Sequence, residues 1–350
     1  MNFVFTGGGT AGHVTPNIAL IPLMQNKGYT VHYIGRCEGI ERDLIEKMPG
    51  VTYHGISAGK LRRYNNIKNL TDPFRVVKGY FQALKIFKEL KPVGLFSKGG
   101  FVSVPVVMAA KAHKVPIVIH ESDMTPGLAT KLCLPHAKKA CTTFKKTAEN
   151  LGKKGVCTGT PLRDSLLHGS GDIARKKLQL DNKPVILIMG GSLGAKAIND
   201  NIRKVLDRLL PLFNIVHICG KGKTDESINK KGYIQLEYVN EELPDIMALS
   251  DIVISRAGSN SINEFLALNK PMLLIPLSRE FSRGDQIDNT LEFESLGYCK
   301  KLFEEDITED KLVNQIKDLY DERTKYSETM KKSGAHRGCE NVLNVILQSI

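Results

Sequence analysis

The chain has 350 residues, with 49 Lys plus Arg against 37 Asp plus Glu, which gives a formal net charge of +12. Its 42% hydrophobic and 25% charged content is that of a folded globular protein and excludes a disordered chain. The length suggests about two domains, and the longest uncharged apolar run, residues 102–110, is far shorter than the ~20 residues that span a bilayer.

Short apolar runs alternate with longer amphipathic stretches along the whole chain. In the first half the predicted strands are residues 2–6, 30–34, 51–54, 93–97, 117–120 and 140–143. In the second half they are residues 185–189, 215–219, 233–238, 252–255 and 272–277. Helical patterns lie between most of these runs, which predicts an α/β protein with parallel sheets and helices on both sheet faces.

The two halves of the chain begin alike, each with a strand, a glycine-rich turn and a helix start. This repetition predicts two Rossmann-like domains rather than one long sheet. Glycine and proline at Gly159 and Pro161 break the pattern and place the boundary there. We expect an N-terminal domain over residues 1–158, a C-terminal domain over residues 159–330, and a helical segment over residues 331–350 that packs back on the first domain.

The seven cysteines are scattered and odd in number, and none has a metal-ligand spacing. They are expected to be free thiols in a reducing cytosol, and the N-terminus has neither the basic region nor the cleavage site of a signal peptide. The positive charge suits nucleic acid, an anionic membrane or a phosphorylated ligand, or is only a solvated surface. Nucleic acid is disfavoured because the lysines are dispersed and no nucleic-acid motif is found.

The first glycine turn, residues 7–12 (GGGTAG), matches the dinucleotide pattern G-x-G-x-x-G. An NAD site also needs an acid about 20 residues further on, and the nearest one, Glu38, lies beyond that spacing and follows basic Arg36. A tight turn without a ligand is an alternative, and backbone N–H groups at a helix N-terminus favour phosphate. His13 follows directly and is a candidate neutral base or a packing residue.

A second glycine turn, residues 190–195 (GGSLGA), contains Ser192, which we expect to be a helix N-cap that helps to hold a diphosphate. Two such turns, one per domain, indicate two phosphorylated partners. The stretch 255–264 also leads from a strand into a helix and carries Ser259 and Glu264. Glu264 is either the acceptor of two hydrogen bonds from a ribose diol or an ordinary exposed glutamate.

Six motifs in a fixed order extend this pattern over most of the chain. They are GGTAGH (8–13), HESD with PG (120–127), GTPLR (159–163), GGSLGA (190–195), SRAG through Glu264 (255–264) and GDQIDN (284–289). Together they resemble glycosyltransferase family 28, the bacterial N-acetylglucosaminyltransferases that convert lipid I to lipid II in peptidoglycan synthesis. The resemblance implies the GT-B fold, with two Rossmann-like domains facing across a cleft, and an inverting transferase that uses neither a metal nor another cofactor.

The resemblance further implies that the second domain binds UDP-N-acetylglucosamine and the first domain the lipid acceptor. Glu264 would bind the ribose, and the turn around Ser192 and Leu193, with Arg163, the diphosphate. The residues around the uracil and diphosphate would be Val239, Ser259, Asn260, Ser261, Ile262 and Asn263, and those on the sugar hydroxyls Asp285, Gln286 and Asn289. The first-domain loop facing the donor sugar and the acceptor diphosphate would be Gly9, Thr10, Ala11 and Gly12.

The reaction itself needs a base, because a sugar hydroxyl is a poor nucleophile until its proton is removed. The C4 hydroxyl of the muramyl sugar would attack C1 of N-acetylglucosamine with inversion. His13 is the first candidate for the base, and Asp123, which stands where many relatives carry Asn, is the second. The sequence holds no Asp-x-Asp motif for a metal, so helix N-termini and Arg163 would stabilise the departing UDP.

A lipid acceptor requires membrane contact, and the best candidate is a predicted helix over residues 73–90. One broad face, expected to be core, carries Val76, Val77, Tyr80, Ala83, Leu84 and Phe87. At its edge Phe74 and Phe81 lie near Lys78 and Lys85, as suits an anionic lipid surface at the cytoplasmic face of the cell membrane; the alternative is that both are the rim of the core. Arg62, Arg63, Lys68 and Lys98 would extend the basic surface.

Three other functions remain open from the sequence. One is a transferase of the same fold that acts on another lipid acceptor; the first-domain loops would distinguish this function from transfer to lipid I. Another is a UDP-N-acetylglucosamine 2-epimerase, which would release free sugar products and ignore membranes. The third is a nucleotide-sugar-binding subunit without activity, in which His13 and Asp123 would be dispensable.

Overall fold

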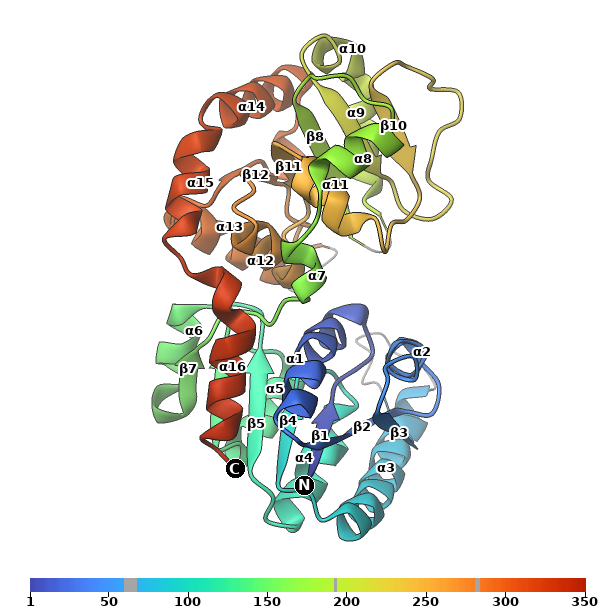
Figure 1. The fold of residues 1–350 in the computed structure, drawn as a ribbon, viewed down its shortest axis with the longest axis vertical. Helices are drawn as coiled ribbons and strands as arrows, with labels where there is room; N and C mark the ends of the chain where they lie inside the picture. Colours follow the sequence, from blue (N-terminus) through green and yellow to red (C-terminus); the bar gives the residue numbers. More distant parts are fainter. Residues whose placement is uncertain (60–67, 192–193, 281–283) are drawn as a thin grey trace. The chain divides into compact units, whose positions relative to one another are not determined.

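The computed structural model describes residues 1–59, 68–191, 194–280 and 284–350. The chain divides into two compact units, which are described separately here. Unit 1 comprises Met1–Arg163 together with Arg337–Ile350, and unit 2 comprises Asp164–His336 (Figure 1). Each unit is built on one parallel sheet, as the alternation of strands and helices predicts.

Unit 1 contains a seven-stranded sheet in the order β3-β2-β1-β4-β5-β6-β7. The strands are β1 Asn2–Thr6, β2 Thr30–Arg36, β3 Val51–Ile56, β4 Gly94–Ser97, β5 Ile117–Glu121, β6 Lys139–Thr142 and β7 Gly155–Cys157. The helices are η1 Ala11–His13, α1 Thr15–Asn26, α2 Ile40–Ile45, α3 Lys68–Leu90, α4 Ser103–Ala112, α5 Leu128–Cys133, η2 Leu134–His136, α6 Lys145–Asn150, η3 Gly152–Lys154 and α16 Gly338–Leu347. Strand β7 was not predicted, since three residues at a sheet edge leave too short a pattern.

Unit 2 contains a six-stranded sheet in the order β10-β9-β8-β11-β12-β13. The strands are β8 Val185–Met189, β9 Asn214–Ile218, β10 Tyr233–Leu236, β11 Ile252–Ser255, β12 Met272–Leu274 and β13 Cys299–Lys301. The helices are α7 Asp164–Leu167, α8 Gly171–Lys177, α9 Lys196–Lys204, α10 Leu206–Leu209, α11 Leu243–Leu249, α12 Ser259–Ala267, α13 Asp285–Ser295, η4 Glu304–Asp306, α14 Glu309–Asp321 and α15 Arg323–Lys331, and η5 Ala335–Arg337 spans the division between the units. Strand β13 was also missed, because two of its three residues are lysines.

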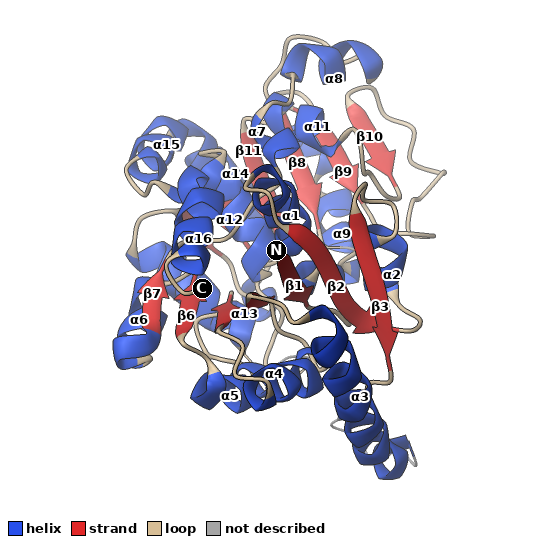
Figure 2. Ribbon diagram, turned by 60° about the horizontal axis from the view of Figure 1, so that its bottom comes forward, coloured by secondary structure: helices blue, strands red, loops and turns tan. Residues whose placement is uncertain are grey.

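The first sheet has an apolar core on each face, which explains why the interior strand β1 carries three consecutive apolar residues, Phe3, Val4 and Phe5. Side chains alternate along β1, so that Val4 packs on one side while Phe3 and Phe5 pack on the other. Helices α3, α4 and α5 cover the Val4 side, and α1 and α16 cover the opposite side (Figure 2).

The last helix, α16, belongs to unit 1 although it follows unit 2 in the chain. It packs against α1 and β6. Two polar contacts fasten this segment: Asn341 Nδ2 donates to the Thr158 carbonyl at 3.1 Å, and Lys138 Nζ donates to the Ser349 carbonyl at 2.8 Å. Two chain crossings therefore join the units, one after Arg163 and one before Arg337.

Helix α3 begins at Lys68, earlier than the predicted start, and Pro73 lies inside it. Ala83 and Phe87 are buried as expected, but the expectation that Val77 is core is wrong because its side chain is 54% exposed. Phe74 and Phe81 are 77% and 62% exposed, so they project beyond the rim of the core. Arg62 and Arg63 lie outside the described residues. Among the residues that are described, no helix is long and apolar enough to cross a membrane.

Candidate functional site

The strand order reverses at one point in each sheet, between β1 and β4 in unit 1 and between β8 and β11 in unit 2. Loops that leave the carboxyl ends of two such strands run in opposite directions and open a crevice where α/β proteins bind ligands. The predicted glycine turns, residues 7–12 and 190–195, follow β1 and β8 directly. The stretch 256–258 follows β11. All three predicted turns therefore lie at these reversal points.

The turn after β1 is held against the turn after β4. A Cβ on Gly100 would lie 2.2 Å from the carbonyl oxygen of Gly8, so only glycine allows the two turns to approach. Within the first turn Gly9 has a φ of +88°, and the Thr10 hydroxyl lies 3.0 Å from Nδ1 of His13. The imidazole of His13 borders Gly100. Helix α1 begins at Thr15, so His13 sits in the short helical turn before it.

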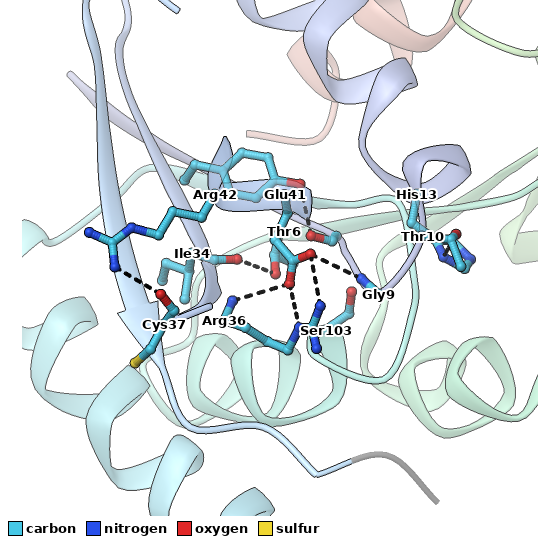
Figure 3. Close-up of polar contacts among 12 residues, drawn as sticks. Thr6, Gly9, Thr10, His13, Ile34, Arg36, Cys37, Glu41, Arg42 and Ser103 are labelled. Carbon is cyan, nitrogen blue, oxygen red and sulfur yellow. Dashed lines mark hydrogen bonds and ion pairs between the residues drawn. The ribbon is translucent and has the colours of Figure 1, made fainter. Parts of the chain in front are cut away.

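A buried carboxylate, Glu41 at the start of α2, lies beneath this turn (Figure 3). Its Oε2 accepts the Gly9 N–H at 3.2 Å, and its Oε1 accepts the Nε–H of Arg36 at 2.8 Å. Burial raises the pKa of Glu41, but the hydrogen bonds from Arg36 and from backbone N–H groups outweigh it and hold the pKa below its ordinary value. The guanidinium of Arg36 also lies over the Phe101 ring, 5.3 Å from its centroid. Sequence reasoning missed Glu41, because nothing local marks it as buried.

Asp123 lies in the loop after β5, the strand next to β4. Glu121 shapes this loop: its Oε1 accepts the Asp123 N–H at 3.0 Å and its Oε2 accepts the Gly127 N–H at 3.1 Å. Asp123 itself is half-buried. The loop therefore places Asp123 at the carboxyl edge of the sheet, while the carboxylate of Glu121 is hydrogen-bonded to backbone N–H groups.

Lys98 was expected on the basic surface, and that expectation is wrong because the residue is 2% exposed. It directly follows β4, and its Nζ donates to the Ser122 hydroxyl. Burial lowers the pKa of Lys98 to about 8, against the opposing effect of Glu121 and Asp123. Its neighbour His120 is also buried: its Nε2 lies 2.9 Å from the Gly159 carbonyl, and burial followed by the charge of Lys98 lowers the pKa of His120 well below its ordinary value.

The glycine turn of unit 2 is described only in part, since Ser192 and Leu193 lie outside the described residues. Helix α9 begins at Lys196 with Ala195 as its N-cap residue, so the prediction of an N-cap at Ser192 is wrong. Gly194 has a φ of +68°, and a Cβ there would lie 2.0 Å from the Cys219 carbonyl oxygen. Gly194 is thus packed closely against the residue that follows β9.

Helix α12 begins at Ser259, right after the turn that follows β11. The first N–H groups of any helix have no partner within the helix and favour anions. Ile262 and Asn263 are buried, and Asn263 Nδ2 donates to the Ser259 carbonyl at 2.7 Å. The half-buried residues of this helix are Asn260, Ser261 and Glu264. Glu264 is therefore neither fully buried nor a fully exposed glutamate.

Helix α13 begins at Asp285, with Gly284 as its N-cap in the left-handed conformation at a φ of +85°. Gln286 Oε1 accepts the Leu277 N–H at 3.0 Å, which ties the helix to the segment after β12. Asn289 is fully buried and its Nδ2 donates to the Ala257 carbonyl at 3.2 Å. Asp285 and Gln286 are half-buried.

Two further predicted donor residues lie apart from these helices. Val239 is half-buried in the segment after β10. Arg163 is half-buried at the end of the first segment of unit 1, and its buried Nε has no hydrogen-bond partner among the described residues. A buried guanidinium N–H without a partner is uncommon and suits an anionic ligand.

Comparisons with known proteins agree with this architecture. The model of the glycosyltransferase family 28 N-terminal domain matches residues 3–142, and that of the C-terminal domain matches residues 185–342. A UDP-N-acetylglucosamine–N-acetylmuramyl-(pentapeptide) pyrophosphoryl-undecaprenol N-acetylglucosamine transferase from Clostridium botulinum is 54% identical over 346 residues, which cover 98% of each chain. The protein of the same name from Geobacillus thermodenitrificans is also 54% identical, over 98% of this chain and 97% of its own.

Solved structures with similar folds include MurG of Acinetobacter baumannii, with a TM-score of 0.78, 23% identity and 99% of both chains covered. A UDP-GlcNAc 2-epimerase from Neisseria meningitidis bound to UDP-GlcNAc has a TM-score of 0.71 and 14% identity, over 99% of this chain and 100% of its own. At such identities the similarity concerns the GT-B fold alone and does not separate transferases from epimerases. The family models and the full-length relatives do separate them, and they place the chain in glycosyltransferase family 28.

Proposed function

We propose that this protein transfers N-acetylglucosamine from UDP-N-acetylglucosamine to the C4 hydroxyl of the muramyl sugar of lipid I, which yields lipid II. The observation that carries the proposal is the 54% identity over 98% of both chains to transferases named for that donor and acceptor.

We infer that unit 2 holds the donor. Support comes from the reversal point between β8 and β11, because the glycine turn follows β8 and α12 begins shortly after β11. Backbone N–H groups at the start of α12 suit the diphosphate of UDP. Glu264 lies one to two helical turns further along α12 and is assigned to the ribose hydroxyls. Asp285, Gln286 and Asn289 on α13 are assigned to the sugar, and Val239 with Ser259–Asn263 to the uracil and diphosphate.

We infer that unit 1 holds the acceptor at the turn formed by Gly9, Thr10, Ala11 and Gly12. His13 is the first choice for the base that takes the proton of the C4 hydroxyl, and Asp123 is the second. As the oxygen attacks C1, the bond from C1 to the UDP oxygen breaks and UDP leaves with the electron pair, so the configuration inverts. Arg163 and the helix N-termini are assigned to the charge that develops on UDP.

Peripheral binding to the cytoplasmic face of the cell membrane completes the proposal. Support comes from α3, where Phe74, Val77 and Phe81 are each more than half exposed. Lys78 and Lys85 on the same helix are also exposed. Aromatic and aliphatic side chains bordered by lysines bind the interface of an anionic bilayer.

The test is release of UDP from UDP-N-acetylglucosamine, with and without a soluble lipid I analogue, in the presence of EDTA. Release that requires the analogue and survives EDTA supports the transferase, its donor and its independence of metal together. Release without any acceptor, or conversion of the nucleotide sugar to its 2-epimer, would contradict the proposal in favour of an epimerase. Release of UDP that requires a different glycolipid would show that this glycolipid, and not lipid I, is the acceptor.

A further inference from the structure

The roles assigned so far do not include one for the buried ammonium of Lys98. Lys98 lies between the two parts of unit 1 that carry the candidate bases. Its backbone N–H donates to the Thr6 carbonyl at 2.9 Å, directly before the glycine turn that leads to His13. Its side chain reaches in the opposite direction along the sheet edge and donates to the Ser122 hydroxyl, the residue before Asp123.

Lysine is a poor choice if this position needed only volume. A lysine that is 2% exposed loses most of its hydration, and an apolar side chain of similar length would fill the space without that penalty. The compensating groups are those of the loop after β5, since Glu121 and Asp123 both stabilise the ammonium. The other titratable neighbours are His120, which burial keeps neutral, and the buried thiol Cys141.

The two carboxylates differ in what else they do. Both oxygens of Glu121 accept backbone N–H groups of the loop, and the residue is 7% exposed. Asp123 is half-buried and is thus the more accessible of the two. A nearby cation stabilises an ionised carboxylate. Lys98 supplies that cation, and its contact with Ser122 ties it to the backbone that carries Asp123.

We propose that Lys98 is a positioning residue that keeps Asp123 ionised and oriented toward the acceptor sugar. The inference rests on the proposed function, because an ionised Asp123 can take the proton of a substrate hydroxyl and a protonated Asp123 cannot. Attraction to a nearby cation lowers a carboxyl pKa, so loss of the cation moves protonation of Asp123 to higher pH. As the pH is lowered, a variant without Lys98 should therefore lose activity at a higher pH than the wild type does.

The kinetic test compares kcat/KM of the wild type with that of Lys98→Met between pH 5 and pH 8. Taking the ratio at each pH cancels any titration that both proteins share. We expect the ratio to grow as the pH falls, to about twofold at pH 5 if the pKa of Asp123 rises by one unit from an ordinary aspartate value. Lys98→Arg keeps the cation and should abolish most of this growth.

Lys270→Met is the matched control, because Lys270 is a half-buried lysine whose pKa burial likewise lowers to about 8. Its Nζ donates to the carbonyls of Ala248 and Ser250 in unit 2, so its loss should reduce stability without changing the pH dependence of the ratio. In an Asp123→Asn background, Lys98→Met should lose its pH-dependent effect, since the two residues act on the same step.

A second readout does not depend on turnover. The carboxyl carbon of Asp123, assigned by its absence in Asp123→Asn, is titrated by NMR in protein labelled at aspartate. We expect its midpoint to rise by about one pH unit in Lys98→Met. An unchanged midpoint in a folded variant would overturn the inference, and so would a shifted midpoint with a pH-independent kinetic ratio. If the wild type shows no acceptor-dependent UDP release, the proposed function fails, while the NMR midpoint still decides whether Lys98 controls Asp123.

Discussion

Replacing Glu41 tests whether its buried carboxylate stabilises the first glycine turn. In the wild type this fully buried carboxylate accepts hydrogen bonds from the Gly9 N–H at 3.2 Å, the Arg36 Nε–H at 2.8 Å and the Arg36 backbone N–H at 3.4 Å. Glu41→Ala removes both acceptor oxygens, and with them these hydrogen bonds, and leaves the guanidinium of Arg36 without its anion.

The size of the effect follows from burial. Breaking a fully buried ion pair costs about 3–5 kcal/mol, but the side chain of Arg36 is 31% exposed and can turn to water. We therefore expect Glu41→Ala to lower the free energy of unfolding of unit 1 by about 3 kcal/mol. For a unit of this size that corresponds to a fall in Tm of roughly 6–10 °C. Glu41→Gln keeps an acceptor oxygen and loses the charge, and should cost about half as much.

Activity should fall together with stability, because the turn tied to Glu41 carries Thr10 and His13. A displacement of about 1 Å in a reacting group can cost about a hundredfold in rate. We expect Glu41→Gln to lower kcat while the KM for the donor changes little, since the donor is assigned to unit 2.

The pH dependence has a definite sign. The pKa of Glu41 is lower in the folded protein than its ordinary value of 4.5. Its stabilisation is therefore complete above about pH 4.5 and is lost as the pH falls through the folded value. The difference in Tm between the wild type and Glu41→Gln should shrink below that pH.

The assay is thermal unfolding followed by calorimetry, with Glu46→Ala as the control. Glu46 pairs with Arg42 at 2.9 Å just after α2, but both side chains are 47% exposed, so its loss should cost less than about 1 kcal/mol. If Glu41→Ala melts within 2 °C of the wild type, as this control should, the carboxylate does not hold the turn and the reasoning is refuted.

Three other substitutions test the assigned roles. Glu264→Ala should raise the KM for UDP-N-acetylglucosamine strongly, because the ribose loses its acceptor, and an unchanged KM in initial-rate kinetics would refute the ribose assignment. His13→Ala should lower kcat by ~10²–10⁴ with an unchanged melting curve, and near-normal turnover would move the base elsewhere. Phe74→Ser combined with Phe81→Ser should weaken binding to anionic vesicles in a flotation assay without loss of stability, because both side chains are mostly exposed. Undiminished binding would show that α3 is not the membrane-binding face.

The strands were predictable where burial makes them apolar on both faces. Residues 2–6 and 185–189 are central strands, and their predicted bounds agree with the structure. The edge strands β7 and β13 escaped because an edge strand needs fewer apolar residues. The start of α9 was misplaced for a different reason, since Ser192 has the right chemistry for an N-cap but the helix begins four residues later.

Surface and core were harder to separate on a single helix. The helical period correctly placed Ala83 and Phe87 of α3 in the core. It wrongly added Val77, because a periodic pattern gives the centre of an apolar face and not its width, which depends on how far the neighbouring helix α4 reaches.

By itself the sequence determined the α/β class, the two-unit repeat and the family, because each of these depends on local patterns and on motifs a few residues long. Only the tertiary structure decided that Lys98 is buried beside Ser122 and that Glu41 supports Gly9. These partners are 24 and 32 residues apart in the chain. Their contacts follow from the order of strands in the sheet, which brings the loops after neighbouring strands together, and no local pattern in the chain encodes that order.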